Sequence, residues 1–430
     1  MNKQEFEQLF ESNNIYSYDT VESVKRCFVP YERSEEAIER ATNFARVSAA
    51  EAIQDVKDFF NCLKCCYSGY DYFIGDEKCD EICNRVIKKI KSKMFRRISN
   101  KELSELLYGS LRDIITDSHF LIYASGIERN FARKHIAYVT DIVVRECVEG
   151  YVVVKGNEEF PCSYQFGEGE VKEFLLPTLY VDESATGEEK YYLLGKYTLT
   201  ETKEITISGR SVPTHRILSD MAVQEGEDRL SFKDGYAIAN HKSYGMPWNR
   251  ELMDEFYQEG LSCAQTEVVI LNLLSNGGGS SDYPEHFYRG LSGIEENGFS
   301  GAHLPMPEDV KDGVKTYDRY DCVKESDIKN TFQGKLFVVM NKGTASSAEM
   351  AVSPAFYMEN AILAGSATYG CGTFGECLFY QLPNSGILFR NGHKLFWHER
   401  FEEGIGFLPD YWIDDVNPVE VIEKYVAQNS

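Results

Sequence analysis

Long apolar runs are missing from this chain of 430 residues. No stretch approaches the roughly 18 apolar residues that a membrane-spanning helix requires, so the sequence predicts no membrane partner. The first residues, MNKQEF, lack the apolar segment of a secretory signal. We therefore expect a cytoplasmic protein, although a chain from which a signal had been removed would look the same. Internal repeats and low-complexity tracts are also absent.

Positive charge is scarce. The chain has 45 Lys and Arg residues against 68 Asp and Glu residues, which gives a formal net charge of −23. Nucleic acids and anionic membranes are bound by basic patches, and the short basic run at residues 88–93 is expected to be the solvated face of a helix. The composition therefore argues against a nucleic-acid partner. An apolar content of 43% is that of a soluble globular protein, and the length is sufficient for two or three domains.

Twelve cysteines without a visible secretory signal suggest a reducing compartment and free thiols. Five of them fall into two closely spaced groups: Cys62, Cys65, Cys66, Cys79 and Cys83. Thiols spaced in this way could hold a tetrahedral Zn²⁺. However, residues 55–66 and 77–90 have the pattern of helices that place these thiols on apolar faces. Core packing is therefore the favoured interpretation, and we predict neither a metal nor an organic cofactor.

The most informative segment is residues 341–349, with the sequence NKGTASSAE. It follows an apolar, strand-like run at 335–340 and precedes residues that we expect to form a helix over 347–359. A strand, a tight turn, a serine and a helix in this order present a hydroxyl at a helix N-terminus. The unpaired N–H groups and the positive end of the helix dipole favour a developing oxyanion there. Ser346 is thus a candidate nucleophile, although a serine at this position is more often only a helix N-cap.

Two further motifs lie in the same half of the chain. Residues 272–279, NLLSNGGG, follow a strand-like run, and residues 402–410, EEGIGFLPD, lie near the C-terminus. Together with 341–349 they resemble, over roughly residues 233–425, the serine peptidase family that includes C-terminal processing (tail-specific) peptidases and tricorn protease. The resemblance implies a crotonase-like β/α superhelix, and a peptidase that forms an acyl-enzyme on peptide or unfolded protein substrates. It implies no cofactor, and a homo-oligomer is compatible with it.

One position departs from the processing branch of this family. There a lysine in a T-[FY]-G-K-G turn acts as the general base, whereas residues 368–372 of this chain are TYGCG. Cys371 stands where the lysine would be, which excludes a Ser–Lys dyad, because a thiol cannot replace an amine base without itself being activated. Either the base comes from elsewhere or the protein is inactive.

The tricorn-like branch takes its base from the N-terminal helical region, and residues 115–122, ITDSHFLI, lie at the matching place. The resemblance implies His119 as the general base for Ser346, with Ser118 and Glu403 as the polar relay behind the base. A neutral imidazole has a suitable pKa for accepting the serine proton near pH 7. Rival side chains for the relay and the base are Glu399, Glu402, His393 and His398.

The oxyanion donors implied by the resemblance are the main-chain N–H groups of Ser347 and of Gly279 or a neighbouring glycine, such as Gly278. Glycine is expected because the backbone must approach the substrate with no Cβ in the way. The alternative is that residues 277–279 form only a flexible turn.

We expect an α/β protein with three regions: a mainly helical subdomain at 1–125, a β-rich module at 126–232 and an α/β peptidase core at 233–430. Family members often carry a PDZ domain at the place of the module, but no convincing PDZ carboxylate loop is visible here. The core helices are expected at 249–259, 345–358 and 418–427. The stretch 280–330, rich in Gly, Asp, Tyr and Pro, could be a lid or substrate loop.

Two other functions remain open. Cys371 and the NLL sequence at 272–274, where family members commonly have DLR, would suit an inactive member of the fold that binds peptides or apolar ligands. A weaker alternative is an acyl-group enzyme of the wider crotonase-like fold.

Overall fold

The structure is a computed structural model of the chain, and it describes all residues except 12–14, 93–96, 182–188, 225–227, 322–327 and 430. The protein is a mixed α/β protein. It divides into two compact units, each built from separate sections of the chain. The first unit comprises Met1–Arg133, Phe299–Cys322 and Cys371–Gly404, and the second comprises Lys134–Gly298, Val323–Gly370 and Ile405–Ser430. Each unit is described by itself below.

The helices of the first unit are α1 (Lys3–Gln8), α2 (Tyr18–Cys27), α3 (Ser34–Thr42), α4 (Ala49–Cys66), α5 (Tyr70–Phe73), α6 (Gly75–Lys91) and α7 (Asn100–Leu111). The longer ones form where apolar residues recur at helical spacing, and α7 begins with a capping box between Ser99 and Glu102. Helix α7 ends at Leu111. The one-turn helix α5 begins at Tyr70, four residues after α4 ends.

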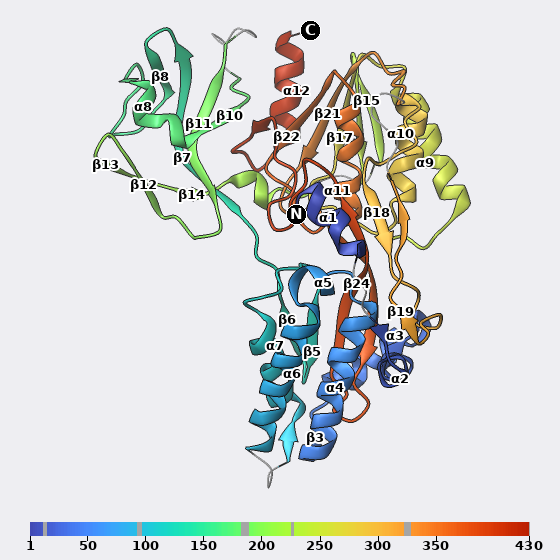
Figure 1. Cartoon of the computed structure of the whole chain (residues 1–430). Coiled ribbons are helices and arrows are strands. Elements are labelled where there is room, and N and C mark those ends of the chain that lie inside the picture. Colours follow the sequence, from blue (N-terminus) through green and yellow to red (C-terminus); the bar gives the residue numbers. More distant parts are fainter. Residues whose placement is uncertain (12–14, 93–96, 182–188, 225–227, 322–327, 430) are drawn as a thin grey trace. The chain divides into compact units, whose positions relative to one another are not determined.

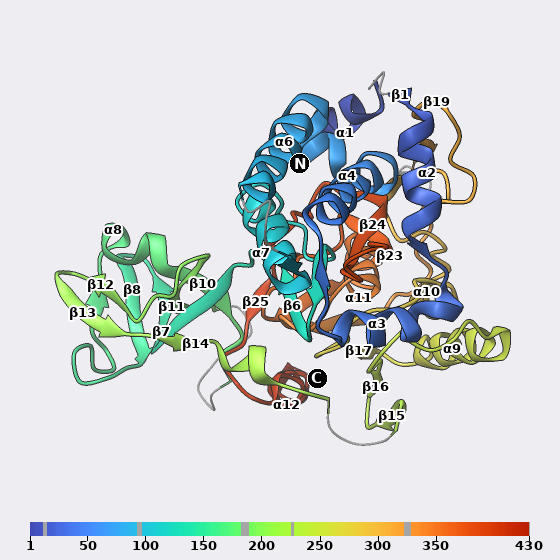
Figure 2. The ribbon, with the colours of Figure 1, turned by 90° about the horizontal axis from the view of Figure 1, so that it is seen from below.

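The sheet of the first unit draws its strands from all three sections of the unit. Its order is β2 (Phe28–Val29), β23 (Phe374–Gln381), β24 (Leu388–Trp397), β18 (Ser300–His303) and β20 (Asp318–Tyr320), with β5 (Leu121–Ala124) on β24 and β6 (Ile127–Asn130) on β5. Two small pairs are β1 (Ile15–Tyr16) with β19 (Gly313–Val314) and β3 (Arg46–Val47) with β4 (Ile98–Ser99). Helix α4 packs on β24, and α7 packs on β5 (Figures 1 and 2). The register pairs Arg390 with Leu121, two residues after His119.

The cysteine groups of the helical region are part of the apolar core of this unit. Cys62, Cys65, Cys66 and Cys79 are buried in one cluster with the side chains of α4, α6 and α7, and Cys83 packs against it. The interpretation as core packing is therefore confirmed. Among the described residues, no group of three or more His, Cys, Asp or Glu side chains is placed to hold a metal ion.

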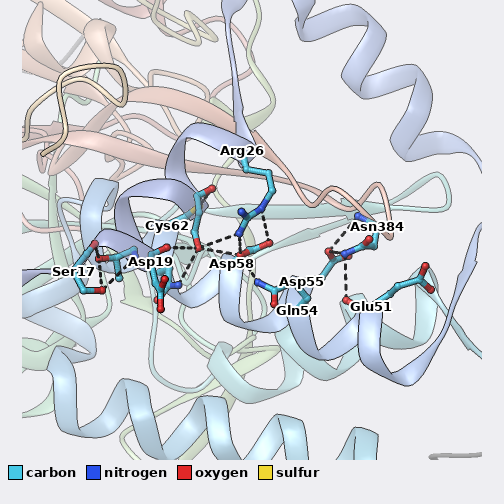
Figure 3. Close-up of polar contacts among 12 residues, drawn as sticks. Ser17, Asp19, Arg26, Glu51, Gln54, Asp55, Asp58, Cys62 and Asn384 are labelled. Atoms are coloured by element: carbon cyan, nitrogen blue, oxygen red, sulfur yellow. Dashed lines mark hydrogen bonds and ion pairs between the residues drawn. The ribbon is translucent and has the colours of Figure 1, made fainter. Parts of the chain in front are cut away.

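A buried carboxylate organises the polar contacts between α2 and α4 (Figure 3). The Asp58 side chain is fully buried, and it accepts hydrogen bonds from Arg26 Nε at 3.2 Å and Nη2 at 2.5 Å. Ser23 and Gln54 donate to the same carboxylate, at 2.9 and 3.0 Å. The Arg26 side chain is 43% exposed, so this ion pair joins a buried anion to a cation at the surface.

Replacing Arg26 with methionine is expected to lower the free energy of unfolding by about 3 kcal/mol, because Asp58 then stays buried without its cationic partner. The measurement is urea-induced unfolding of the variant beside the wild type. The matched control is Arg33→Met, which removes an ion pair to Glu36 whose side chains are 68% and 71% exposed. That change should cost no more than about 1 kcal/mol. Equal losses in the two variants would contradict the burial argument.

The second unit contains a sheet that follows the expected alternation of strands and helices. Its order is β15 (Leu230–Lys233), β16 (Tyr236–Asn240), β17 (Val268–Asn272), β21 (Lys335–Met340), β22 (Ala361–Gly365) and β25 (Tyr411–Trp412), and every pair except β15–β16 is parallel. Its helices are α9 (Arg250–Cys263), α10 (Asp282–Ser292), α11 (Ser347–Met350) and α12 (Pro418–Asn429). Helices α9 and α10 lie side by side (Figures 1 and 2). Because parallel strands end at the same edge, the loops after β17 and β21 are neighbours.

Two expectations about this unit are corrected. The helix expected at 345–358 is only the one-turn α11, followed by a 3₁₀ helix at Ser353–Tyr357, because Pro354 cannot donate the hydrogen bond that a continuous α-helix needs. The stretch 280–330 is not a plain loop, since it contains α10 in the second unit. Pro284 lies in the first turn of α10, where a missing N–H is tolerated.

A second sheet of the same unit contains the strands expected between 126 and 232. Its strands are β7 (Ile136–Cys147), β8 (Gly150–Lys155), β9 (Gln165–Phe166), β10 (Leu175–Thr178), β11 (Tyr191–Thr198) and β14 (His215–Arg216), beside the hairpin of β12 (Glu204–Ile207) and β13 (Arg210–Pro213) and the short α8 (Glu168–Val171). Val139 and Leu193 of this sheet share an apolar cluster with Ala367 and Trp412. In the described part of the chain, no helix has both the length and the apolar character to cross a membrane.

Candidate active site

The turn that carries Ser346 begins where β21 ends. Asn341 starts it, and its side-chain oxygen accepts the N–H of Gly343 at 2.9 Å and that of Ser275 at 3.0 Å. The hydroxyl of Thr344 accepts the N–H of Asn341 and donates to the carbonyl of Leu273. The short polar side chains of Asn341 and Thr344 therefore close the turn and join it to the loop that follows β17.

Ser346 has an unusual backbone conformation. Its φ is 56° and its ψ is −123°, immediately before the first residue of α11. L-residues with a side chain rarely adopt a positive φ, and such strain concentrates at functional positions. A strained serine between a strand and a helix is also how a nucleophile elbow presents its hydroxyl. The serine is partly exposed.

Glu349 fixes the position of this strained residue. Its fully buried carboxylate accepts the N–H of Ser346 at 3.1 Å, the hydroxyl of Thr368 at 2.6 Å and the N–H of Gly370 at 2.7 Å. Glu349 was not among the site residues predicted from the sequence. A signal was present, because an acidic side chain three residues after a serine is the spacing of a capping box.

Lys342, the cation nearest to Ser346 in the sequence, is held by acceptors. Its ammonium donates to the Tyr197 hydroxyl at 2.7 Å, the Thr368 carbonyl at 2.5 Å and the Ile405 carbonyl at 3.0 Å, and the side chain is buried. An ammonium has three hydrogen-bond donors, and all three are used here. Lys342 therefore stabilises the turn at residues 341–346 through hydrogen bonds, and its amine is not arranged to accept a proton from Ser346.

The glycine loop after β17 lies directly against Ser346. A Cβ on Gly278 would fall 2.8 Å from the Cβ of Ser346 and 2.9 Å from the nitrogen of Ser347. A Cβ on Gly279 would fall 1.9 Å from the carbonyl oxygen of Tyr244. Their φ values are 92° and 137°, so both positions need glycine for space and for conformation.

The same loop provides a main-chain hydrogen-bond donor beside the serine. The N–H of Gly278 donates to the Asn276 side chain at 2.9 Å. Within the described ranges, the N–H groups of Gly279 and Ser347 have no acceptor. The hydroxyl of Ser347 donates to the carbonyl of Gly279 at 2.6 Å, which joins the two segments. This arrangement can stabilise a negative oxygen that develops next to Ser346.

The strain at Ser346 can be measured through two variants that both remove the hydroxyl. We expect Ser346→Gly to have a free energy of unfolding about 1 kcal/mol higher than Ser346→Ala, because glycine tolerates a positive φ. The control pair is Ser104→Gly and Ser104→Ala, inside α7. The order should be reversed there, since glycine costs a helix about 1 kcal/mol relative to alanine. If Ser346→Gly is the less stable of its pair, the serine is not strained.

His119 lies in the first unit, directly before β5. Its main-chain N–H donates to the buried carboxylate of Asp117 at 2.7 Å, and its main-chain carbonyl accepts from Arg390 Nε at 3.1 Å. The pKa of the His119 imidazole is lowered to about 4, chiefly by burial and also by the charge of Arg390, while a backbone hydrogen bond with Phe374 acts in the opposite direction. The imidazole is therefore neutral at pH 7, as a general base must be.

Glu403 contacts the main chain beside His119. One carboxylate oxygen accepts the N–H of Ser118 at 3.2 Å, and the other accepts the N–H of Thr373 at 3.1 Å. The hydroxyl of Ser118 and Nδ1 of His119 are buried and have no hydrogen-bond partner among the described residues. The contact of Glu403 with Ser118 thus runs through the backbone and not through the Ser118 hydroxyl.

The structure places the predicted site residues in two groups. Ser346, Ser347, Gly278 and Gly279 come together in the second unit, and Ser118, His119 and Glu403 come together in the first. The rivals His393 and His398 are also buried in the first unit, and burial lowers the pKa of each to about 4. Cys371 is buried as well.

Several solved structures that are similar to this chain are described as peptidases. One is a protein assigned to the peptidases from Parabacteroides merdae, with a TM-score of 0.46 and 14% identity, over 89% of this chain and 96% of that chain. Another is mature CPAF, with a TM-score of 0.46 and 13% identity over 89% and 95%. The photosystem II D1 C-terminal processing protease has a TM-score of 0.39 and 13% identity over 86% and 96%. No family model and no curated protein matches the chain.

Proposed function

We propose that this protein is a serine peptidase in which Ser346 is the nucleophile. The observation that carries the proposal is the strained backbone of Ser346 at the junction of β21 and α11. Beside it lie the N–H groups of Gly279 and Ser347, which have no acceptor in the part of the chain that the structure describes. A helix cap alone requires neither a positive φ nor a pair of glycines packed against the serine. Both are what a reactive hydroxyl with an oxyanion site needs.

In the proposed reaction, the Ser346 hydroxyl attacks the carbonyl carbon of the scissile peptide bond while His119 accepts its proton. The oxyanion is bound by the N–H groups of Gly279 and Ser347. The C–N bond then breaks, the leaving amine takes the proton from His119, and an acyl-enzyme remains. Water then attacks the ester carbonyl and gives a proton to His119, and His119 returns that proton to the Ser346 oxygen as the ester bond breaks. Ser118 and Glu403 are proposed to support the main chain that carries His119.

The domain assignment belongs to the same proposal. Residues 233–430 would form a crotonase-like β/α superhelix as the peptidase core, residues 1–125 would form the helical subdomain that supplies His119, and residues 126–232 would be an inserted β-rich module. The substrate would be a peptide or an unfolded protein.

The proposal is tested by incubating the protein with a mixture of unstructured peptides at pH 7 and identifying the products by mass spectrometry. We expect new peptide termini with the wild type and none with Ser346→Ala. The same products from both proteins would indicate a contaminating peptidase and contradict the role of Ser346.

A second candidate is an inactive member of the fold that binds peptides or apolar ligands. The buried Cys371 at the place of the family lysine favours it, together with the absence of a partner for Nδ1 of His119 among the described residues. Retention of a peptide at equilibrium with no new termini, in wild type and Ser346→Ala alike, would support this candidate over the peptidase.

A further inference from the structure

A fully satisfied histidine lies behind the glycine loop, and the proposed reaction does not use it. His241 directly follows β16 and is buried. Its Nδ1 is 2.8 Å from the Tyr244 hydroxyl, and its Nε2 is 3.1 Å from a carboxylate oxygen of Glu259 on α9. The second oxygen of Glu259 forms an ion pair with Arg229 at 2.8 Å. Polar side chains of the sheet and of α9 therefore meet in a chain that ends at Tyr244.

The direction of these hydrogen bonds follows from the chemistry of the groups. A carboxylate only accepts, so Nε2 of His241 carries a hydrogen toward Glu259. With a single hydrogen on the ring, Nδ1 then accepts, and the Tyr244 hydroxyl donates to it. The rings of Phe256 and Phe287 stand edge-on to the imidazole, with centroids 4.9 and 4.8 Å away. The imidazole is thus fixed by two hydrogen bonds and by two aromatic walls.

The main chain of Tyr244 is in turn bound to the glycine loop. Its N–H donates to the carbonyl of Gly278 at 3.0 Å, and its carbonyl accepts the N–H of Ser280 at 2.9 Å. These two bonds enclose Gly279, where a Cβ would fall 1.9 Å from the Tyr244 carbonyl oxygen. The backbone at Gly279 therefore cannot shift unless Tyr244 shifts too.

We propose that His241 and Tyr244 are positioning residues for the oxyanion site. The Glu259–His241–Tyr244 chain fixes the Tyr244 main chain, which orients the peptide between Gly278 and Gly279 so that its N–H points to the developing oxyanion. The effect on catalysis rests on the proposed function, whereas the effect on the loop does not. Buried polar groups need partners, and an apolar trio of the same size would fill this space without fixing the position of the Tyr244 backbone.

The positioning role of Tyr244 is tested with Tyr244→Phe, which keeps the ring and removes only the hydroxyl. The matched control is Tyr288→Phe on α10, because Tyr288 is equally buried and its hydroxyl has no partner among the described residues. An HNCO signal joins the amide of one residue to the carbonyl carbon of the residue before it, and residues 277–279 contain the only adjacent glycines in the sequence. In protein labelled with ¹³C′,¹⁵N-glycine, the spectrum therefore shows only the amides of Gly278 and Gly279.

We expect both amide signals to move in Tyr244→Phe and to stay in place in Tyr288→Phe. For peptide hydrolysis, kcat should fall by about tenfold in Tyr244→Phe with an unchanged KM, since a displaced oxyanion donor acts on the transition state. The affinity for a peptide aldehyde should fall by the same factor. Glu259→Gln, which weakens the chain at its other end, should move the same two signals and serves if Tyr244→Phe does not fold.

Unchanged glycine signals in folded Tyr244→Phe and Glu259→Gln would overturn the proposal, as would a shift of the same size in Tyr288→Phe. Shifted signals with unchanged kcat would overturn the catalytic part. If the wild type itself hydrolyses no peptide, the proposed function fails, and the two amide signals still decide whether the chain positions the loop.

Discussion

Replacing Ser346 with alanine is expected to lower kcat for peptide hydrolysis by about 10⁵-fold, because the acyl-enzyme cannot form without the hydroxyl. Binding should be nearly unaffected, since an alanine at this position would keep the main chain and the N–H of Ser347 would remain in place. The measurement is steady-state hydrolysis of a peptide substrate, together with the affinity of the variant for that peptide.

A buried serine in the same segment provides the control for this experiment. Ser353 donates to the carbonyl of Met350 at 2.9 Å and has no place in the proposed chemistry. Ser353→Ala should therefore keep the wild-type kcat once its folding has been verified. A loss of activity confined to KM in Ser346→Ala, or an equal loss of kcat in Ser353→Ala, would show that Ser346 is not the nucleophile.

Removal of the proposed base is expected to have an effect nearly as large. His119→Ala should lower kcat by about 10⁴-fold, because no side chain would then accept the serine proton. The control is His393→Phe, since His393 is buried in the same unit and its pKa is lowered to a similar degree. Equal losses in the two histidine variants would indicate a general effect on folding and contradict the role of His119.

The pH dependence provides an independent test of His119. Only the neutral imidazole accepts a proton, and its pKa in the folded protein is about 4. The value of kcat/KM should therefore stay level as the pH falls through 6.5 and decline only near pH 4. Removing the adjacent cation with Arg390→Gln should raise the pKa of His119 and move this decline to higher pH. A wild-type decline centred near 6.5 would contradict the assignment.

The lowered pKa of His119 also makes the folded protein less stable as the pH falls. His119 binds a proton less readily in the folded state than in the unfolded state, whose pKa is near 6.5. The unfolded chain therefore holds more protons between pH 6.5 and 4, and its population rises as the pH falls through this window. Its contribution to stability is complete above pH 6.5 and is lost on acidification.

Local sequence patterns predicted the centre of the second unit well. The strands at 268–272 and 335–340 are continuous apolar runs, as fully buried parallel strands require. The family resemblance implied that the glycines after the first strand lie beside the serine after the second, and Gly278 does lie against Ser346. The predicted extent of the following helix was wrong. Helix propensity over residues 345–358 was given more weight than Pro354, which prevents a continuous α-helix there.

Contacts between distant segments could not be predicted in this way. The pairing of β24 with β5 joins residues more than 260 positions apart, and no periodicity in either strand selects its partner. Tyr244 belongs to no recognised motif, and its role depends on the main-chain bonds to Gly278 and Ser280. The contact of Glu349 with Ser346 could have been predicted from their spacing in the sequence, whereas the buried hydrogen bonds through His241 could not.

A fluorophosphonate probe reports whether Ser346 is an activated nucleophile. The wild type, Ser346→Ala and His119→Ala would be labelled at pH 7, and the adducts located by intact mass and peptide mapping. We predict a single adduct on Ser346 of the wild type, none on Ser346→Ala and sharply slower labelling of His119→Ala. An unlabelled but folded wild type, or an adduct at another residue that persists in Ser346→Ala, would show that Ser346 is not an activated nucleophile.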